Sequence, residues 1–389
     1  MVWSRLVSGE GWAVRRLEDG RSVVNRNTQY LYVIPSHYMC RRGDITLSYK
    51  HQGLKEAEEA SRVEVVTSLR REKFKITVSM NKERPMSQSP LYGKYNIQRY
   101  DLHPNYSFAH LENMIPKNTP EYIDSGQHYV ERITRALYYF KQCALIGPSG
   151  TGKTHIVYLV AELCGLPVWE VNCGLQTSSY DLIGRFIGLG KENWIDGLLT
   201  KWLRLGGIMY LDEANMMKQD VATRLNPVLD TRGHLVLNEK DNEVIERHQY
   251  GYLIVSMNPF SAEFAGTKPL NAAMRRRMAV WINFDYTSVG EKISSDEVKM
   301  LMKRAKIDED TSYKIVKVGA ELRRQYKAGD VPYGPSLGDL INWATLIHDG
   351  NTPNVAAEET IIAVTSDNVE VQDDIRRVVE TAFPKQQSS

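Results

Sequence analysis

The chain has 389 residues, of which 42% are hydrophobic and 25% charged, an ordinary composition for a globular protein with room for two or three domains. It contains no apolar run of membrane-spanning length, and its N-terminus lacks a secretory signal, so we expect a cytoplasmic protein without membrane contact. Its four cysteines form no CxxC pair, which favours reduced thiols over a metal centre.

The net charge of +2 hides an uneven distribution along the chain. The first 100 residues hold 18 Lys and Arg against 10 Asp and Glu, whereas the remaining 289 hold 31 against 37. A basic front end suits an acidic partner such as nucleic acid, and a merely soluble basic domain explains the balance equally well.

The N-terminal third divides into a strand-rich part and a linker. Residues 1–80 have the pattern of short strands and turns, with one short helix expected at 54–61. Residues 81–120 are rich in Pro, Ser, Asn and Tyr without a sustained period, which is typical of a linker. Strand-like and helical segments then alternate until about residue 286, and this alternation predicts a parallel α/β sheet.

The first strand of that region, 144–146, runs into GPSGTGKT, which has the spacing GxxxxGK[ST] between a strand and a helix. Its glycines let backbone N–H groups surround a phosphate at the positive end of the helix. Lys153 is expected to reach the β- and γ-phosphates, and Thr154 to bind Mg²⁺. The predicted nucleotide-binding residues are Gly147, Pro148, Ser149, Gly150, Thr151, Gly152, Lys153 and Thr154.

Two later apolar strands end in polar residues that suit the same chemistry. GGIMYLDEAN is typical of a strand buried on both faces, and it ends in Asp212 and Glu213. We expect Asp212 to hold Mg²⁺ and Glu213 to polarise an attacking water as general base. YLIVSMNP ends at Asn258, whose amide orients that water, contacts the γ-phosphate, or caps a turn before Pro259.

LNAAMRRRM, residues 270–278, places three arginines at the end of a short apolar run. The group is a solvated basic patch, a nucleic-acid contact, or the source of a catalytic arginine aimed at another molecule's phosphate. A basic helix end that offsets the helix dipole is the simplest explanation for Arg275.

From residue 287 onward the pattern is helical. SSDEVKMLMKRA begins with the spacing of a capping box, Ser294 and Glu297. GPSLG, residues 334–338, matches the GxSxG elbow of serine hydrolases, but no buried strand precedes it. Ser336 is therefore predicted to be the N-cap of the next helix.

Together these motifs resemble the AAA+ ATPases, and specifically the MoxR branch with the NorQ and CbbQ type, the CobS chelatase subunit, the dynein-related domains and midasin. The resemblance spans about residues 121–384. It rests on GPSGTGKT, SSYDLIGRF, WIDGLLTKWLRLGGIMYLDEAN, LNPVLDTRGHLVLNEKDNEVIERHQYGYLIVSMNP and LNAAMRRRM. It implies ATP and Mg²⁺ as cofactors, ATP hydrolysis, and a homo-oligomeric ring, expected to be a hexamer. It also implies chaperone-like remodelling of a partner, often with a von Willebrand factor A-domain protein.

The resemblance also implies a role for each motif residue. Lys153 and Thr154 fall in the Walker A motif, Asp212 and Glu213 in the Walker B motif, and Asn258 at sensor 1. With the arginine finger described next, the expected catalytic residues are Glu213, Asn258 and Arg277, and the expected metal ligands are Thr154 and Asp212.

The arginine finger of the family precedes an aromatic residue at the end of the NAAMRRR helix. Arg277 occupies that position here, Met278 replaces the usual Phe, and Arg276 is the reserve candidate. In the family's architecture this arginine lies too near the far edge of the sheet to reach its own nucleotide. The resemblance therefore implies that Arg277 serves the neighbouring subunit.

Two insertions agree with the family pattern, and one lid residue departs from it. Residues 184–197 fit the family's insertion in the second helix, and residues 233–252 predict a β-hairpin with an acidic tip. In related proteins these elements face the pore and touch substrates or partners. The lid arginine called sensor 2 is missing, because Gly338 stands in its place, and Arg323 and Arg324 are possible substitutes.

We expect an α/β fold: an AAA+ P-loop parallel sheet core with a C-terminal helical lid, preceded by a small β-rich N-terminal domain. The expected domains are the basic, β-rich N-terminal domain with its linker at 1–110, the nucleotide-binding core at 111–286 and the helical lid at 287–389. The leading function is a ring-forming ATPase that remodels a partner protein. The alternative is a nucleic-acid-associated motor or switch, similar to McrB, that binds DNA or RNA through the basic N-terminal domain.

Overall fold

The computed structural model describes six strands between residues 12 and 78, and then residues 89, 91–104, 106–187, 193–230, 233–259 and 269–384. The early strands form two antiparallel three-stranded sheets. They are β1 (Trp12–Arg16), β2 (Ser22–Arg26), β3 (Tyr30–Ile34), β4 (Thr46–Ser48), β5 (Val63–Leu69) and β6 (Glu72–Val78). The helix expected at 54–61 lies outside the described residues.

The centre of the protein is a five-stranded parallel sheet with the order β15-β7-β14-β11-β8. Its strands are β7 (Gln142–Ile146), β8 (Val168–Asn172), β11 (Gly207–Asp212), β14 (Gly251–Met257) and β15 (Trp281–Asn283). Because every pairing is parallel, all carboxyl ends meet at one edge, where ligands of open α/β sheets bind. This confirms the predicted parallel sheet.

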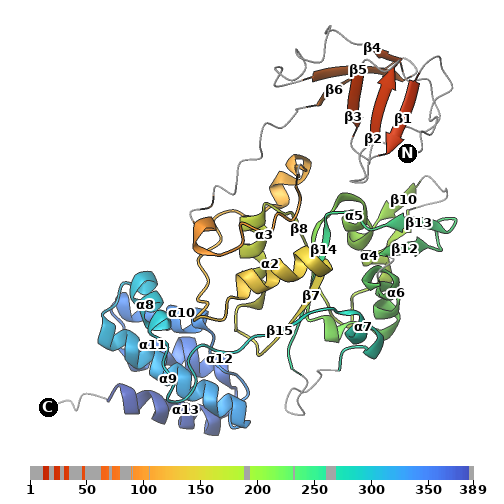
Figure 1. Ribbon diagram of the computed structural model, residues 1–389. Coiled ribbons are helices and arrows are strands. Elements are labelled where there is room, and N and C mark those ends of the chain that lie inside the picture. The colour runs from red at the N-terminus through yellow and green to blue at the C-terminus, as the bar shows by residue number, and fades with distance from the viewer. Residues whose placement is uncertain are drawn as a thin grey trace.

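Helices cover both faces of this sheet (Figure 1). They are α2 (Tyr129–Phe140) and α3 (Lys153–Cys164) on one face, and α5 (Leu198–Leu205) and α6 (Gln219–Leu229) on the other. Successive strand residues alternate between the two cores, as the pleat of a strand requires: Ile208 and Tyr210 pack with the first pair of helices, Met209 and Leu211 with the second. Burial on both faces explains the uninterrupted apolar runs of β11 and β14.

The segment expected to be a linker packs against the first core from about residue 91 onward. It contains the short 3-10 helices η1 (Tyr92–Lys94) and η2 (Ala109–Met114). Five of its apolar side chains are buried in that core: Tyr95, Ile97, Tyr100, Leu102 and Phe108. Irregular backbone gives these residues no helical or strand period, so the sequence pattern did not show their burial.

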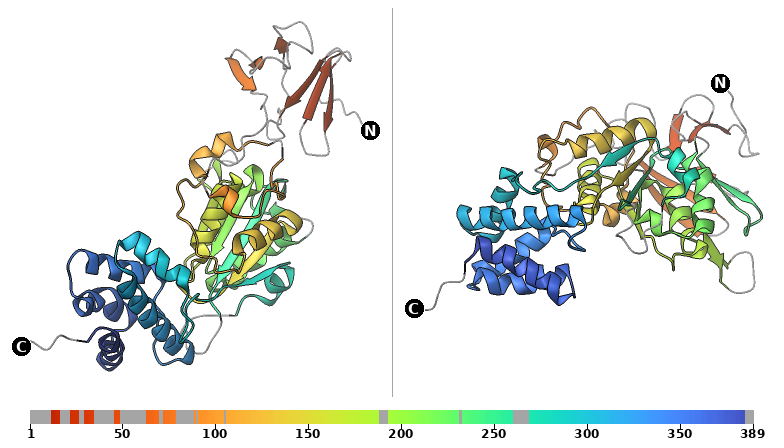
Figure 2. Two further views of the ribbon diagram at one scale, coloured as in Figure 1. Left: turned by 60° about the vertical axis from the view of Figure 1, so that its left-hand side comes forward. Right: turned by 90° about the horizontal axis from the view of Figure 1, so that it is seen from below.

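The C-terminal helices form a separate apolar core and lie together beside the sheet (Figure 2). They are α8 (Ser295–Ala305), α9 (Glu309–Ala328), α10 (Leu337–His348), α11 (Pro353–Ala357), the π-helical turn η5 (Glu358–Ile362), α12 (Ala363–Thr365) and α13 (Val369–Ala382). Ser336 caps α10 by accepting from the Asp339 N–H, as predicted. No helix within the described part of the chain is long and apolar enough to cross a membrane.

The capping box predicted at the start of α8 is wrong. Ser294 is the N-cap residue, but its side chain accepts no hydrogen bond from the helix. Glu297 is 1% exposed, and its carboxylate accepts from Arg323 and Thr287 instead of the N-cap backbone. Burying an unpaired carboxylate costs much free energy, so Glu297 pairs with Arg323 instead of bonding to the helix N-terminus.

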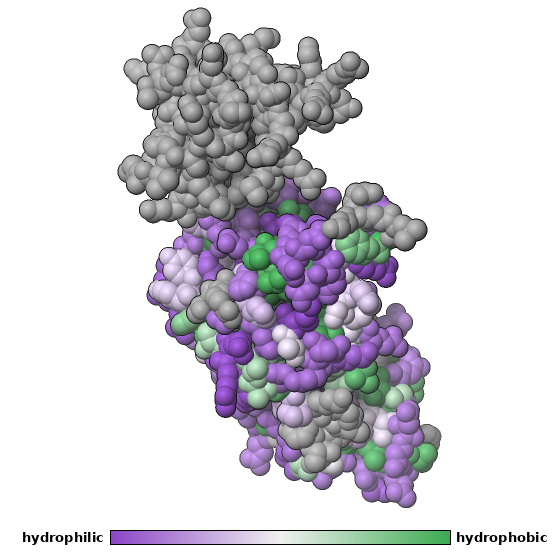
Figure 3. Space-filling model, turned by 90° about the vertical axis from the view of Figure 1, so that its right-hand side faces the viewer, coloured by the Kyte–Doolittle hydropathy of each residue, from purple (hydrophilic) through white to green (hydrophobic). Residues whose placement is uncertain are grey.

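Both predicted insertions form antiparallel hairpins. Strands β9 (Gly184–Phe186) and β10 (Trp194–Asp196) follow the short helix α4 (Ser179–Leu182), and β12 (His234–Leu237) pairs with β13 (Glu243–Glu246). Asp241 and Asn242 have φ angles of 51° and 55°, which suit a tight hairpin turn. On this side of the molecule hydrophobic side chains lie in small patches between hydrophilic ones (Figure 3). The exposed apolar residues here are Leu175, Tyr180, Phe186, Ile187, Ile195, Leu198 and Val244.

Candidate nucleotide and catalytic site

The glycine-rich loop joins the carboxyl end of β7 to the start of α3, and three other parts of the chain press on its glycines. A Cβ on Gly147 would lie 2.7 Å from Phe284 Cβ, one on Gly150 2.7 Å from Ser336 Cβ, and one on Gly152 2.7 Å from Tyr122. The last two glycines also have left-handed φ angles of 74° and 83°. Glycine is therefore required at all three positions by the surrounding chain.

Lys153, the first residue of α3, is buried within the loop. Its Nζ donates to the carbonyl oxygens of Gly147 and Pro148 at 2.7 Å each, and to Asn258 Oδ1 at 3.1 Å. Burial lowers the pKa of Lys153 to about 8, although the nearby Asp212 and Glu213 carboxylates favour the charged form. The structure thus brings together the predicted Walker A lysine, in the segment after β7, and the predicted sensor 1 amide, which follows the neighbouring strand β14.

The Asp212 carboxylate at the end of β11 is held by two hydroxyl groups, and both of these hydroxyls contact a third. Thr154 Oγ1 donates to its Oδ2 at 3.1 Å, and Ser256 Oγ on β14 donates to its Oδ1. The Tyr210 hydroxyl lies 3.1 Å from both Thr154 Oγ1 and Ser256 Oγ. Sequence reasoning missed Ser256 and Tyr210, whose only signal is a polar group inside an apolar strand.

Thr154 and Asp212 also fit the expected Mg²⁺ site. Both present oxygen atoms, which are the ligands that Mg²⁺ prefers, and the two oxygens lie 3.1 Å apart, between the start of α3 and the end of β11. A metal held by these two residues would neutralise part of the charge of phosphates bound by the loop.

Glu213 is exposed and has an unusual backbone conformation. Its φ angle is 51°, in the left-handed region that non-glycine residues avoid, and its N–H donates to Asp212 Oδ1 at 3.0 Å. Such a conformation costs on the order of 1–3 kcal/mol and is concentrated at functional sites. The turn separates the two neighbouring carboxylates: Asp212 accepts a hydrogen bond from Thr154, whereas the Glu213 side chain is exposed.

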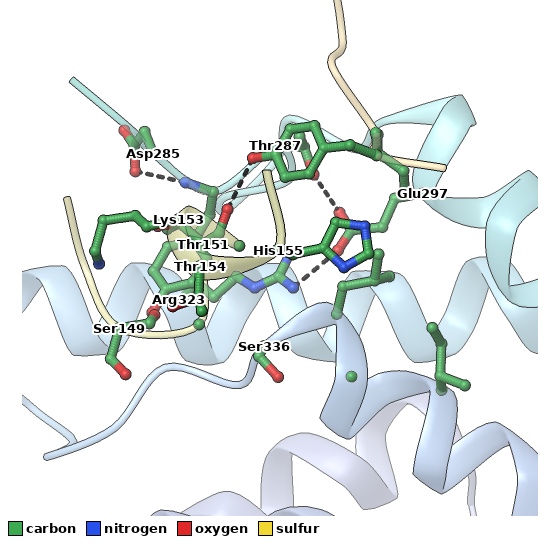
Figure 4. A pocket seen from close by; sticks show the side chains of 18 of the residues that line it. Ser149, Thr151, Lys153, Thr154, His155, Asp285, Thr287, Glu297, Arg323 and Ser336 are labelled. Atoms are coloured by element: carbon green, nitrogen blue, oxygen red, sulfur yellow. Dashed lines mark hydrogen bonds and ion pairs between the residues drawn. The ribbon is translucent and has the colours of Figure 1, made fainter. Parts of the chain in front are cut away.

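These residues line a cavity of about 500 Å³ between the sheet and the lid. Its core side contains the loop, Asp212, Glu213 and Asn258, and lid residues close the other side (Figure 4). Apolar side chains from three parts of the chain also line it: Tyr122, Ile123, Met300, Leu337 and Ile341. A cavity of this size with one polar and one apolar part suits a nucleotide.

The two candidate substitutes for the missing lid arginine differ sharply. Arg323 is 1% exposed, lines the cavity and pairs with Glu297 at 2.8 Å. A dashed line marks this ion pair in Figure 4. Burial alone would raise the pKa of Glu297, but the Arg323 guanidinium and surrounding hydrogen bonds hold it below its usual value. Arg324 is exposed, pairs with Glu321 and is absent from the cavity lining among the described residues.

The arginine cluster lies on α7 (Ala272–Arg277), away from this cavity. Arg275 stacks on the Trp281 ring at 4.8 Å, and Arg276 is exposed. Arg277 Nη1 donates to the Ala273 carbonyl at 3.0 Å, and the Arg277 carbonyl accepts from Gln142 Nε2 at 2.6 Å. In the described residues, none of the three arginines lines the nucleotide cavity.

Nucleotide binding is expected to weaken as the pH rises through 8. Below the pKa of Lys153, about 8, its ammonium attracts the phosphates; above it, binding must also take up a proton. The Kd of a fluorescent ADP analogue should therefore rise about tenfold between pH 7 and pH 9. Lys153→Arg, whose guanidinium stays charged, is the control and should show a flatter profile. A wild-type Kd that is constant to pH 9 would contradict this assignment.

Two family models match the chain. The AAA domain of the dynein-related subfamily matches residues 142–278, which run from β7 to the arginine cluster. The CbbQ/NirQ/NorQ C-terminal domain matches residues 297–382, which include most of the lid.

Three curated relatives match over most of their own length. The denitrification regulatory protein NirQ of Pseudomonas aeruginosa is 33% identical over 64% of this chain and 92% of NirQ. CbbQ of Hydrogenophilus thermoluteolus is 30% identical over 70% of this chain and 99% of CbbQ. NorQ of Paracoccus denitrificans is 31% identical over 61% of this chain and 85% of NorQ. The chain therefore belongs to the NirQ, NorQ and CbbQ family, in the MoxR branch of the AAA+ ATPases, and it binds nucleotide and hydrolyses ATP.

Proposed function

We propose that the chain forms a ring in which each nucleotide is hydrolysed with an arginine from the neighbouring subunit, and that the resulting lid motion remodels a partner protein. The observation that carries this proposal is the position of Arg277 relative to the phosphate loop. Gln142, whose side chain holds the Arg277 carbonyl, begins β7, whereas Gly147 follows its end. Five strand residues span roughly 16 Å, farther than an arginine side chain reaches.

A neighbouring subunit removes this difficulty, because Arg277 is then free to meet a phosphate that is not its own. An arginine placed in this way stabilises the charge that develops on the transferred phosphoryl group. Arg276 remains the reserve candidate, because it is exposed on the same short helix, whereas Arg275 is engaged with Trp281.

Within one subunit we propose the following division of labour. Lys153 and the loop amides hold the phosphates, and Thr154 and Asp212 hold Mg²⁺. Glu213 accepts the proton of the attacking water. Asn258, which contacts Lys153 at 3.1 Å, orients that water or the terminal phosphate.

We further propose that the hairpins β9–β10 and β12–β13 present the partner-binding surface. Their exposed apolar residues offer contact area that a monomer leaves in water. A von Willebrand factor A-domain protein in the cytoplasm is the partner that the MoxR resemblance suggests.

We propose that the nucleotide-binding domain begins nearer residue 91 than residue 111, because the segment from 91 onward packs on the sheet. The lid domain begins near residue 287.

The nucleic-acid alternative rests on the basic N-terminal region. The side chains of that region lie outside what the structure describes, so this alternative stays a prediction of the charge distribution.

Assembly provides the direct test of the ring. In the presence of ATP and Mg²⁺, light scattering should give a mass about six times the 44.4 kDa of one chain. The specific ATPase activity should also fall on dilution, because each site requires a neighbour. A monomer whose specific activity is independent of concentration would overturn the proposal.

A further inference from the structure

Tyr286 lies in the segment that connects β15 to the first lid helix, and its hydroxyl touches both sides of the nucleotide cavity. It is 8% exposed and lines that cavity. Its oxygen lies 2.8 Å from the Ser149 carbonyl of the phosphate loop and 3.2 Å from the Gly334 carbonyl of the lid. One side chain thus joins the two parts of the chain that must move relative to each other.

The hydroxyl cannot satisfy both carbonyls fully. Burial raises the pKa of Tyr286, so the phenol keeps its proton at any working pH. It then has a single proton for two oxygen acceptors, and a strong bond to one leaves the other weakly bonded. The shorter distance, to Ser149, indicates that the phosphate loop holds the better bond in this arrangement.

The ring of Tyr286 is held independently of its hydroxyl. The Arg323 guanidinium lies 4.9 Å from the ring centroid, and the Tyr326 ring packs edge-on at 6.3 Å. Arg323 itself is fixed by Glu297 and by the Pro335 carbonyl at 2.7 Å. Removing only the hydroxyl therefore leaves the packing of the ring in place.

The lid loop also presses directly on the phosphate loop beside this tyrosine. A Cβ on Gly150 would lie 2.7 Å from Ser336 Cβ, and a Cβ on Gly334 would lie 2.9 Å from the Tyr286 hydroxyl. Gly338, two residues after Ser336, has no side chain that could reach a nucleotide. At this point Tyr286 and the Ser336 side chain are therefore the groups that join the lid loop to the phosphate loop.

We infer that Tyr286 is a positioning residue that couples the phosphate loop to the lid, by sharing its hydroxyl between the Ser149 and Gly334 carbonyls. When the lid rests on the phosphate loop, the shared hydroxyl restrains both around the nucleotide. When the lid opens, the Gly334 contact is lost and the Ser149 bond remains. The inference concerns retention of nucleotide within one subunit, so it does not depend on the proposed ring.

The test is Tyr286→Phe, with release of a fluorescent ADP analogue measured by stopped flow. One neutral hydrogen bond between loop and lid corresponds to about fivefold faster release. Tyr333→Phe is the matched control, because its hydroxyl donates to Asp339 within the lid at 2.8 Å. The control should release at the wild-type rate. Without nucleotide, the unfolding temperatures of both variants should fall by similar small amounts, because each variant loses a hydroxyl that is hydrogen-bonded within the chain. Release from Tyr286→Phe at the wild-type rate, or equal acceleration in the control, would overturn the inference.

A double-mutant cycle with Gly334→Ala separates this role from general packing. The added methyl would displace the Tyr286 hydroxyl, and it meets the Tyr326 ring at 3.1 Å in either background. Gly334→Ala should therefore accelerate release less in the Tyr286→Phe background than in the wild type. Equal factors in the two backgrounds would show that the hydroxyl and the lid loop act independently, and would count against the coupling.

Discussion

Glu213→Gln is expected to abolish ATP hydrolysis while leaving ATP binding intact. The amide keeps the size of the side chain but cannot accept a proton from the attacking water, so kcat should fall by about 10²–10⁴. Thr154, Asp212 and Lys153, which hold the metal and the phosphates in our proposal, are unchanged by this substitution. Steady-state phosphate release measures the loss of hydrolysis. The Kd of a fluorescent ATP analogue, measured on the same preparation, shows whether ATP binding is retained.

The matched control for this variant is Glu239→Gln. Glu239 pairs with Arg224 at 2.9 Å, and it does not line the nucleotide cavity among the described residues. It should hydrolyse ATP at the wild-type rate. If Glu213→Gln also retains the wild-type kcat, Glu213 is not the general base.

The sheet and the candidate residues at its edge are predictable because they depend on local signals. A strand buried on both faces needs an uninterrupted apolar run, and β11 and β14 have such runs. Polar residues that directly follow such runs must gather at one edge when the strands are parallel. That Asp212 and Asn258 lie close to Lys153 can therefore be predicted without knowing the conformation of the loops between them.

What the sequence does not predict depends on contacts between distant segments. Tyr95 and Phe108 are buried on irregular backbone, where neither period 2 nor period 3.6 applies. Glu297 has the spacing of a capping residue, but Arg323, 26 positions later, determines where its side chain goes. No sequence pattern distinguishes Tyr286 from other tyrosines. Its position between two parts of the chain becomes evident only from the contacts of its hydroxyl with the Ser149 and Gly334 carbonyls.

A mixture of Lys153→Ala and Arg277→Ala subunits is expected to hydrolyse ATP although neither variant does so alone. The first loses its own phosphate site and keeps its arginine, and the second has the opposite defect. Loss of an arginine finger lowers kcat by about 10³–10⁵, so the background of each variant should be small. Random assembly places a competent site beside a competent arginine at about a quarter of the interfaces of a closed ring. Phosphate release from an equimolar mixture should therefore approach about a quarter of the wild-type rate.

Two further arginine variants show whether the effect belongs to Arg277. Arg275→Ala should hydrolyse ATP at nearly the wild-type rate, because that guanidinium is stacked on Trp281. Arg276→Ala distinguishes the reserve candidate: if it is inactive while Arg277→Ala is active, the finger is the exposed Arg276. If Arg277→Ala is inactive and the mixture shows only the sum of the two backgrounds, Arg277 does not act across subunits. Gln142, whose side chain holds the Arg277 carbonyl, and Gly147 lie at opposite ends of β7, roughly 16 Å apart. An Arg277 that served its own phosphate loop would then require α7 to move within one chain.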